Sequence, residues 1–158
     1  MALLIEKVAN VTALYKRLAA LCDTGFALAV HIRYTRPALL YQTYSAAWID
    51  QYNEQGFMLS DPTVRWGLTN TGSMIWDDLA ADDSAGVLLA AREFGLVNGW
   101  TYATGPATSR SMASMTRSTP FSAAQCDDIR AIIDEIHRET DGVDQLPVPT
   151  QEALRAIG

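Results

Sequence analysis

The stretch of sequence that decides the fold is FALAVHIRYT, residues 26–35. Large side chains recur here at every second position, which is the spacing that places them on one face of a β-strand. That face is predicted to carry Phe26, Leu28, Val30, Ile32 and Tyr34. The opposite face is predicted to carry Ala27, Ala29, His31 and Arg33. Its small side chains leave space above the sheet, either for the floor of a pocket or for a closely packed helix.

Two more strands are predicted in the second half of the chain, at 98–105 (NGWTYATG) and 111–118 (SMASMTRS), joined as a hairpin by the turn Gly105-Pro106. Capping residues and helical spacing of apolar residues predict helices around these strands. The predicted helices cover 3–22, 45–55, 62–68, 82–94 and the run within 121–140. The dipeptide Arg36-Pro37 is predicted to open a connection, and 70–73 to form a turn.

The order of these elements favours one class of fold. Strands joined by short turns favour an antiparallel sheet, and the terminal helices must then cover its faces. We therefore predict an α+β fold: an α/β/α sandwich with a central antiparallel sheet of about five strands, flanked by helices on both faces. The composition changes after Thr140, so we expect one domain over 1–140. Residues 141–158 are expected to be a linker followed by the first turns of another domain.

The composition argues against several classes of protein. The net charge of −6 disfavours a large nucleic-acid footprint, because binding to phosphates needs clustered Lys and Arg. No segment reaches the roughly 18 apolar residues of a membrane span, and Glu6 and Lys7 interrupt the only signal-like run. Cys22 and Cys126 form no CxxC pair. We expect unpaired thiols, a cytoplasmic protein and no membrane partner.

Catalytic and metal-binding patterns are missing as well. The two histidines, His31 and His137, lie far apart in the sequence, and each is expected to have a structural role. There is no GxSxG nucleophile motif and no Gly-rich phosphate loop. The sequence therefore predicts no metal site, no cofactor and no enzyme. An enzyme acting on amides or lactones with Asp61 as its base would need a nucleophile or a metal that the sequence does not offer.

An unusual number of aromatic side chains lies in YSAAWIDQYNEQGFMLSDPTVRW, residues 44–66. Tyr44, Trp48 and Tyr52 are spaced four apart, which places them on one face of a helix. Asp61 and Thr63 follow just beyond it. A pocket lined by these residues would bind a mostly apolar ligand with a few polar atoms. The alternatives are a core position for Trp48 and a plain helix-capping role for Asp61.

These residues resemble the N-terminal autoinducer-binding domain of the LuxR family of quorum-sensing transcription factors. The family set is a Trp, a Tyr four residues later, an Asp-Pro pair, a second Trp and a Gly after the next helix. In this sequence the set reads Trp48, Tyr52, Asp61, Pro62, Trp76 and Gly99. The resemblance covers most of residues 1–140. It implies that the ligand is an N-acyl-homoserine lactone and that no cofactor is needed.

The resemblance also implies contacts for the head of the ligand. The indole N–H of Trp48 would donate to the lactone carbonyl, and the carboxylate of Asp61 would accept the amide N–H. Tyr44 and a hydroxyl on the second hairpin strand would bind the amide carbonyl. The family pattern assigns that hydroxyl to Thr116, with Ser114 as the alternative.

Three further side chains complete the implied site. Trp76 would form an aromatic wall near the lactone, and Tyr52 would lie against the acyl chain. Thr63 could make an additional contact with the ligand amide.

The family resemblance implies partners too. We expect a homodimer that reaches promoter DNA only through a helix-turn-helix domain absent from these 158 residues. Two alternatives stay open. One is a short homologue that acts by forming heterodimers with a full-length regulator. The other is a sensor of a different small molecule.

Overall fold

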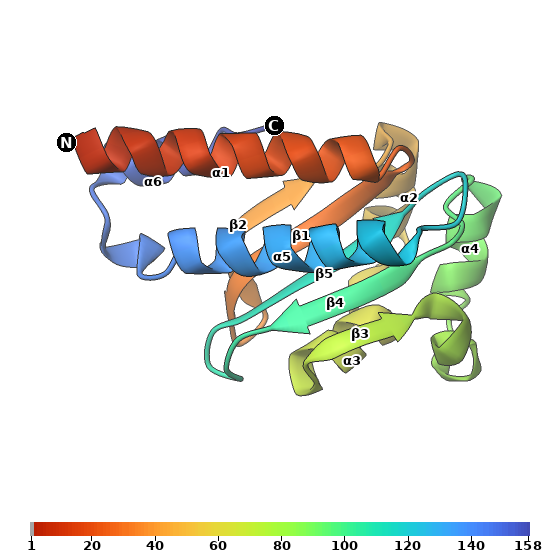
Figure 1. The fold of residues 1–158 in the computed structure, drawn as a ribbon. Helices are drawn as coiled ribbons and strands as arrows, with labels where there is room; N and C mark the ends of the chain where they lie inside the picture. The colour runs from red at the N-terminus through yellow and green to blue at the C-terminus, as the bar shows by residue number, and fades with distance from the viewer. Residues whose placement is uncertain (1) are drawn as a thin grey trace.

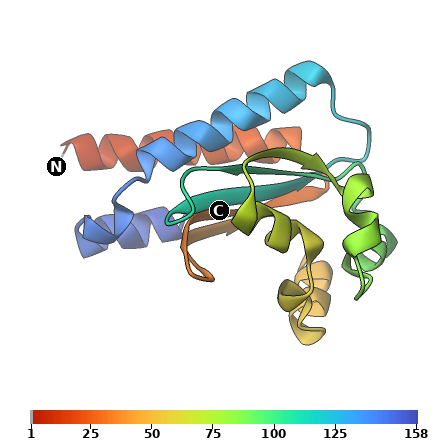
Figure 2. The ribbon, with the colours of Figure 1, turned by 90° about the horizontal axis from the view of Figure 1, so that it is seen from below.

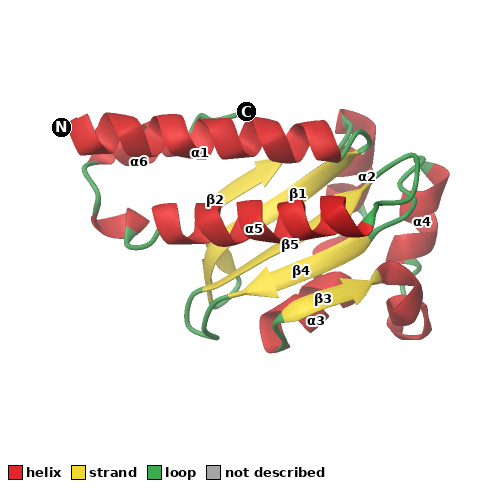
Figure 3. Ribbon diagram, in the orientation of Figure 1, coloured by secondary structure: helices red, strands yellow, loops and turns green. Residues whose placement is uncertain are grey.

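The computed structural model describes residues 2–158, and its centre is one five-stranded antiparallel sheet with the strand order β2-β1-β5-β4-β3 (Figures 1 and 3). The strands are β1 (Gly25–Arg33), β2 (Arg36–Gln42), β3 (Gly72–Ile75), β4 (Trp100–Thr104) and β5 (Arg110–Thr116). The helices are α1 (Ala2–Leu21), α2 (Ala46–Glu54), α3 (Pro62–Thr69), α4 (Val87–Glu93), α5 (Ala123–Glu139) and α6 (Val148–Arg155). Three short 3-10 segments are η1 (Phe57–Leu59), η2 (Trp76–Asp82) and η3 (Val143–Gln145). The predicted α+β class is confirmed.

The helices cover the two faces of the sheet unequally. The long helices α1 and α5 pack together on one face, while α2, α3 and α4 lie on the other (Figure 2). The main apolar core lies under α1 and α5. Its fully buried members include Val11 and Leu18 from α1, Phe26 and Leu28 from β1, and Ile129, Ile132, Ile133 and Ile136 from α5. The isoleucines follow from helical spacing behind the Ser122 cap, which forms a complete capping box with Gln125.

Both edge strands differ from the sequence prediction. β2 begins at Arg36, where a connection was predicted, and β3 occupies Gly72–Ile75, whose first two residues were predicted to belong to a turn. Pro37 argues against a central strand because proline has no N–H to donate, but an edge strand tolerates it. β3 has only four residues and starts with a glycine, so it carries little strand signal of its own. The three strands identified from sequence are the three central ones.

The alternation of β1 breaks at His31. Ala29 pairs with Met112 of β5 and Ile32 pairs with Arg110, so two β1 residues lie opposite one β5 residue. His31 itself has a left-handed backbone, with φ of 52°. This is a β-bulge, which shifts every later side chain to the other face. The prediction that Ile32 shares the face of Phe26 is therefore wrong.

The predicted helix over 82–94 is shorter in the structure. α4 starts at Val87, because the Asp83 carboxylate accepts hydrogen bonds from the backbone N–H groups of Val87 and Leu88 at 2.8 and 2.9 Å. Gly86, which lies between Asp83 and Val87, has a left-handed backbone with φ of 71°. The residues before Asp83 form η2 instead.

The C-terminal residues pack on the rest of the domain. α6 contacts α1 and β2, and Leu154 is completely buried. The Tyr41 hydroxyl of β2 donates to the Leu154 carbonyl at 2.7 Å. Within residues 2–158, no helix has both the length and the apolar character needed to cross a membrane.

Candidate functional site

A cavity of about 430 Å³ lies between the sheet and helices α2, α3 and α4, on the face away from α1 and α5. Ala27 and Ala29 of β1 line it, together with Met112 and Ser114 of β5. The small side chains of β1 were explained either by the floor of a pocket or by a closely packed helix, and the structure shows the floor of a pocket. The bulge adds Ile32 to the same wall.

Two helix caps aim the aromatic and acidic side chains into this cavity. The Ser45 hydroxyl caps α2 by accepting from the backbone N–H of Trp48 at 3.2 Å. Trp48 and Tyr52 then lie one turn apart on the inward face of α2. The chain turns at Gly56 (φ 61°), and Asp61 caps α3 before Pro62.

Asp61 is the most strongly constrained polar group in the cavity wall, with only 7% of the residue exposed. One carboxylate oxygen accepts from the backbone N–H and the hydroxyl of Thr63 at 2.9 and 2.7 Å, and the other accepts from the Tyr52 hydroxyl at 2.9 Å. Burial raises the pKa of Asp61, while the hydrogen bonds from Thr63 and Tyr52 oppose that rise. A carboxylate has about four acceptor sites, so Asp61 can accept one more N–H from a guest.

The two tyrosines are half-buried hydrogen-bond donors. Burial raises the pKa of both Tyr44 and Tyr52 far above neutral pH, so both hydroxyls keep their protons. The Tyr44 hydroxyl donates to the Ser114 carbonyl at 3.2 Å. The indole of Trp48 lies between Tyr52 and Phe94, with ring centroids at 5.8 and 5.3 Å. Because Trp48 lines the cavity, its indole N–H can donate to a guest.

A chain of hydrogen bonds runs from Trp76 along the sheet to the cavity floor. The Trp76 indole N–H donates to the Thr101 hydroxyl at 3.1 Å, and that hydroxyl lies 2.7 Å from the Ser114 hydroxyl. Thr101 and Ser114 are directly paired across β4 and β5. Thr101 was not identified from the sequence, because only the strand register shows that it stands behind Ser114.

The structure brings six of the seven predicted site residues together. Tyr44, Trp48, Tyr52, Asp61, Thr63 and Trp76 all line the cavity. Thr116 does not line it: its hydroxyl donates to the Gly25 carbonyl at 3.1 Å, and it accepts from the Thr24 hydroxyl at 2.8 Å. Ser114, the alternative hydroxyl, lies in the wall.

The apolar rim of the cavity was not identified from the sequence. Leu40 of β2 and Met58 and Leu59 of η1 line the cavity and are 52%, 47% and 83% exposed. Leu40 was not predicted to line the cavity because β2, the strand that carries it, was not predicted. These exposed side chains mark where the cavity opens to solvent.

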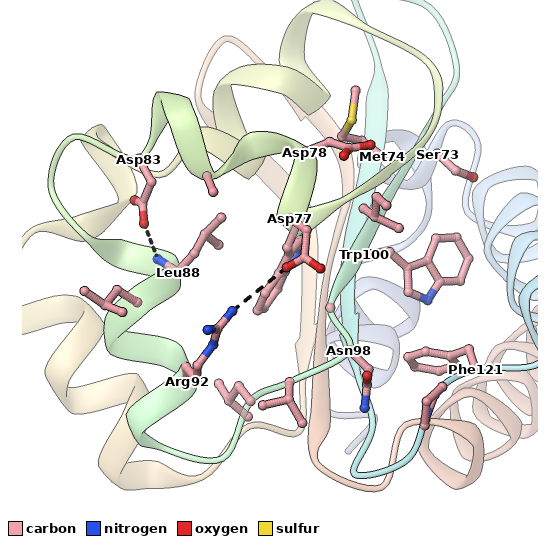
Figure 4. A pocket seen from close by; sticks show the side chains of 18 of the residues that line it. Ser73, Met74, Asp77, Asp78, Asp83, Leu88, Arg92, Asn98, Trp100 and Phe121 are labelled. Carbon is pink, nitrogen blue, oxygen red and sulfur yellow. Dashed lines mark hydrogen bonds and ion pairs between the residues drawn. The ribbon is translucent and has the colours of Figure 1, made fainter.

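A second, wider hollow of about 1130 Å³ lies beside β3, η2 and α4 (Figure 4). Asp77 and Arg92 face each other across it at 3.9 Å, and both are largely exposed. Trp100 and Phe121 lie on its other side, where Arg130 stacks on the Trp100 ring at 5.7 Å. Ligand sites combine an apolar enclosure with a few converging polar groups, and the cavity around Asp61 fits that description better.

Comparison with known proteins identifies the family of this domain. The family model for the autoinducer binding domain matches residues 10–139. The transcriptional activator protein SolR of Ralstonia nicotianae is 35% identical over 72 residues, 45% of this chain and 30% of SolR. The quorum-sensing regulator RhlR of Pseudomonas aeruginosa is 34% identical over 71 residues, 44% of this chain and 30% of RhlR. The matched part thus spans less than a third of each curated relative.

The fold is also found among solved structures. A crystal structure of SdiA from Escherichia coli superposes with a TM-score of 0.65 at 22% identity, covering 85% of this chain and 62% of SdiA. At that identity the likeness concerns the fold alone. The family match, by contrast, spans most of the chain and supports a binding domain rather than an enzyme. The chain belongs to the family of autoinducer-binding domains found in LuxR-type quorum-sensing regulators.

Proposed function

We propose that this domain binds an N-acyl-homoserine lactone in the cavity around Asp61, as the sensor of a quorum-sensing transcriptional regulator. The observation that carries the proposal is the meeting of one buried carboxylate, one indole N–H and two phenols in a largely apolar enclosure. An acyl lactone offers the complementary groups: one amide N–H, carbonyl oxygens and an apolar chain. Each buried polar group left without a partner costs about 1–3 kcal/mol.

The ligand's polar groups can be matched to the wall one by one. The amide N–H would donate to Asp61, and the Trp48 indole would donate to the lactone carbonyl. The hydroxyls of Tyr44 and Ser114 would donate hydrogen bonds to the amide carbonyl. Ser114 thereby takes the role that was predicted for Thr116. The indole of Trp76 would pack against the lactone ring. The acyl chain would run over the alanine floor toward the rim at Leu40, Met58 and Leu59.

Ligand-dependent stability tests this function directly. At a free lactone concentration 100 times Kd, the domain should gain about 2.7 kcal/mol of stability by mass action. Each kcal/mol corresponds to about 2–4 °C in Tm at this size. We expect a rise of several degrees in differential scanning fluorimetry with a panel of short-, medium- and long-chain lactones. Homoserine lactone without an acyl chain is the control. Absence of a shift with every member of the panel would reject the proposal.

The choice between the two hairpin hydroxyls is testable by a matched pair of variants. Ser114→Ala should weaken lactone binding by about 2- to 12-fold, the equivalent of the roughly 0.5–1.5 kcal/mol of one neutral hydrogen bond. Thr116→Val should leave the affinity unchanged and lower Tm, because Thr24 and Gly25 lose their partner. Isothermal titration calorimetry and thermal melting measure both effects. Loss of affinity in Thr116→Val alone would restore Thr116 as the ligand-binding hydroxyl.

We further propose that the regulator works as a homodimer and reaches promoter DNA through a separate helix-turn-helix domain. The relatives support the DNA-binding part of this proposal: SolR is a transcriptional activator and RhlR an HTH-type regulator, and the match covers only 30% of each. The net charge of −6 also disfavours direct DNA binding by these residues. Analytical ultracentrifugation with and without lactone measures the oligomeric state, and a monomer in both conditions would contradict the dimer.

A further inference from the structure

The two histidines of the chain meet in the structure, although 106 positions separate them in the sequence. Their rings stack with centroids 4.2 Å apart and an interplanar angle of 25°. His31 stands at the bulge of β1 and is 4% exposed, and His137 stands in the last turn of α5. No sequence pattern predicts that the two rings meet.

Hydrogen bonds suit both rings in their neutral form. Nε2 of His31 lies 2.9 Å from the His137 carbonyl, which can only accept, so this nitrogen carries the proton. Nδ1 of His31 can then accept from the Ser109 hydroxyl at 2.7 Å. The Ser111 hydroxyl accepts from the His31 backbone N–H at 3.0 Å and lies 2.6 Å from Nδ1 of His137, to which it can donate.

This cluster holds the bulge that shapes the ligand cavity. Ser111 is the single β5 residue opposite Val30 and His31, so its hydroxyl ties the bulge to α5 through His137. The bulge in turn directs Ile32, the next residue, into the cavity wall. The other side of His137 is tightly packed, because a Cβ on Gly105 would lie 2.6 Å from its ring. The rings therefore have little room to separate without moving the bulge.

The charges around the pair oppose each other. Burial lowers the pKa of His137, and the nearby His31 lowers it further. Asp141 and Asp134 act in the opposite direction, while Arg138 adds to the lowering. The turn between β4 and β5 contributes Gly105 and Ser109, which carry no charge.

We propose that the stacked pair His31–His137 is a pH-sensitive latch on the ligand cavity. While both rings are neutral, the latch holds the bulge and keeps Ile32 in the wall. Protonation places a charge in the stack, loosens the bulge and weakens ligand binding. The effect on binding rests on the proposed lactone function, whereas the effect on stability does not.

The direction of the pH effect follows from linkage. A histidine whose pKa is lowered by folding binds fewer protons in the closed state than in the open or unfolded state. Its stabilising contribution is complete above the ordinary pKa of about 6.5 and is lost as the pH falls below it. Mild acid should therefore lower both Tm and ligand affinity.

The test compares the wild type with the double variant H31N/H137N, which contains no histidine. Asparagine can place its amide oxygen near the position of Nδ1 and tolerates the left-handed backbone at position 31. Because protonation of the pair opposes the closed state of the cavity, we expect wild-type affinity for the best lactone to fall about fivefold between about pH 7.5 and about pH 5.5. The variant should change less than about twofold. Any change left in it belongs to other groups, including Asp61.

Histidine-selective NMR provides a second measurement on the wild type. We expect at least one ring to titrate below its ordinary value of about 6.5, and lactone to lower that pKa further. Equal pH responses in wild type and variant, or normal titration that ligand leaves unchanged, would overturn the latch. Absence of lactone binding at both pH values would contradict the proposed function instead. In that case the NMR titration and the pH dependence of the ligand-free melting temperature would test the latch without lactone. The NMR titration of the wild type would also remain as the test if the double variant failed to fold.

Discussion

Replacing Asp61 with asparagine is expected to weaken lactone binding by about 10- to 150-fold, the equivalent of the roughly 1.5–3 kcal/mol that a hydrogen bond to a charged group contributes. Asparagine can still accept from Thr63 through its amide oxygen and so retains the cap of α3. Its amide nitrogen, however, replaces the oxygen that faces Tyr52 and the cavity. The ligand's N–H would then lose a charged acceptor. Isothermal titration calorimetry with the best lactone measures the change.

Stability should move the other way in the same variant. A carboxyl group whose pKa is raised by burial destabilises the folded protein above the ordinary pKa of 3.8, because its charged form is less favourable inside than in water. The ligand-free Asp61→Asn variant should therefore melt at the same or a higher temperature at neutral pH. Asp83→Asn is the matched control, since Asp83 also caps a helix but lies outside the ligand cavity. Unchanged affinity in Asp61→Asn, or an equal loss in Asp83→Asn, would remove Asp61 from the ligand site.

Replacing Gly99 with alanine is expected to destabilise the domain by about 1–3 kcal/mol, the usual range for overpacking. A Cβ at this position would lie 2.2 Å from two ring carbons of Trp76. The indole is rigid, and its N–H is tied to Thr101, so the ring must shift toward the cavity that it lines. Lactone affinity should fall together with Tm. Thermal melting and calorimetry on one protein sample report both.

Gly67→Ala is the matched control for this steric argument. Its Cβ would lie 2.4 Å from Cε and 2.8 Å from Sδ of Met112, the flexible end of an unbranched side chain. Alanine also gains about 1 kcal/mol of helix propensity over glycine inside α3. The variant should therefore melt within a few degrees of the wild type. If Gly67→Ala proved as destabilising as Gly99→Ala, rigidity of the Trp76 ring would not be the cause.

Most of the candidate site could be predicted because its residues are close in sequence. Tyr44, Trp48 and Tyr52 repeat at helical spacing, and the Asp61-Pro62 pair marks the start of the next helix. Such short-range patterns depend on the backbone of one element only. The contacts that link Ser114 to Thr101, or Thr116 to Gly25, depend on how strands pair, and no short-range pattern contains that information.

The sequence by itself determined the caps and apolar faces of the main helices, the three central strands and the family motif around Trp48 and Asp61. Only the tertiary structure decided the two edge strands. Pairing with a neighbouring strand stabilises β2 despite its proline and β3 despite its length of only four residues. It also decided which face each side chain of β1 occupies. The physical reason is that side chains alternate with a period of two, so one extra residue at His31 reverses every later position. That reversal brings Ile32 to the cavity and His31 to His137, and it becomes visible only once β5 lies beside β1.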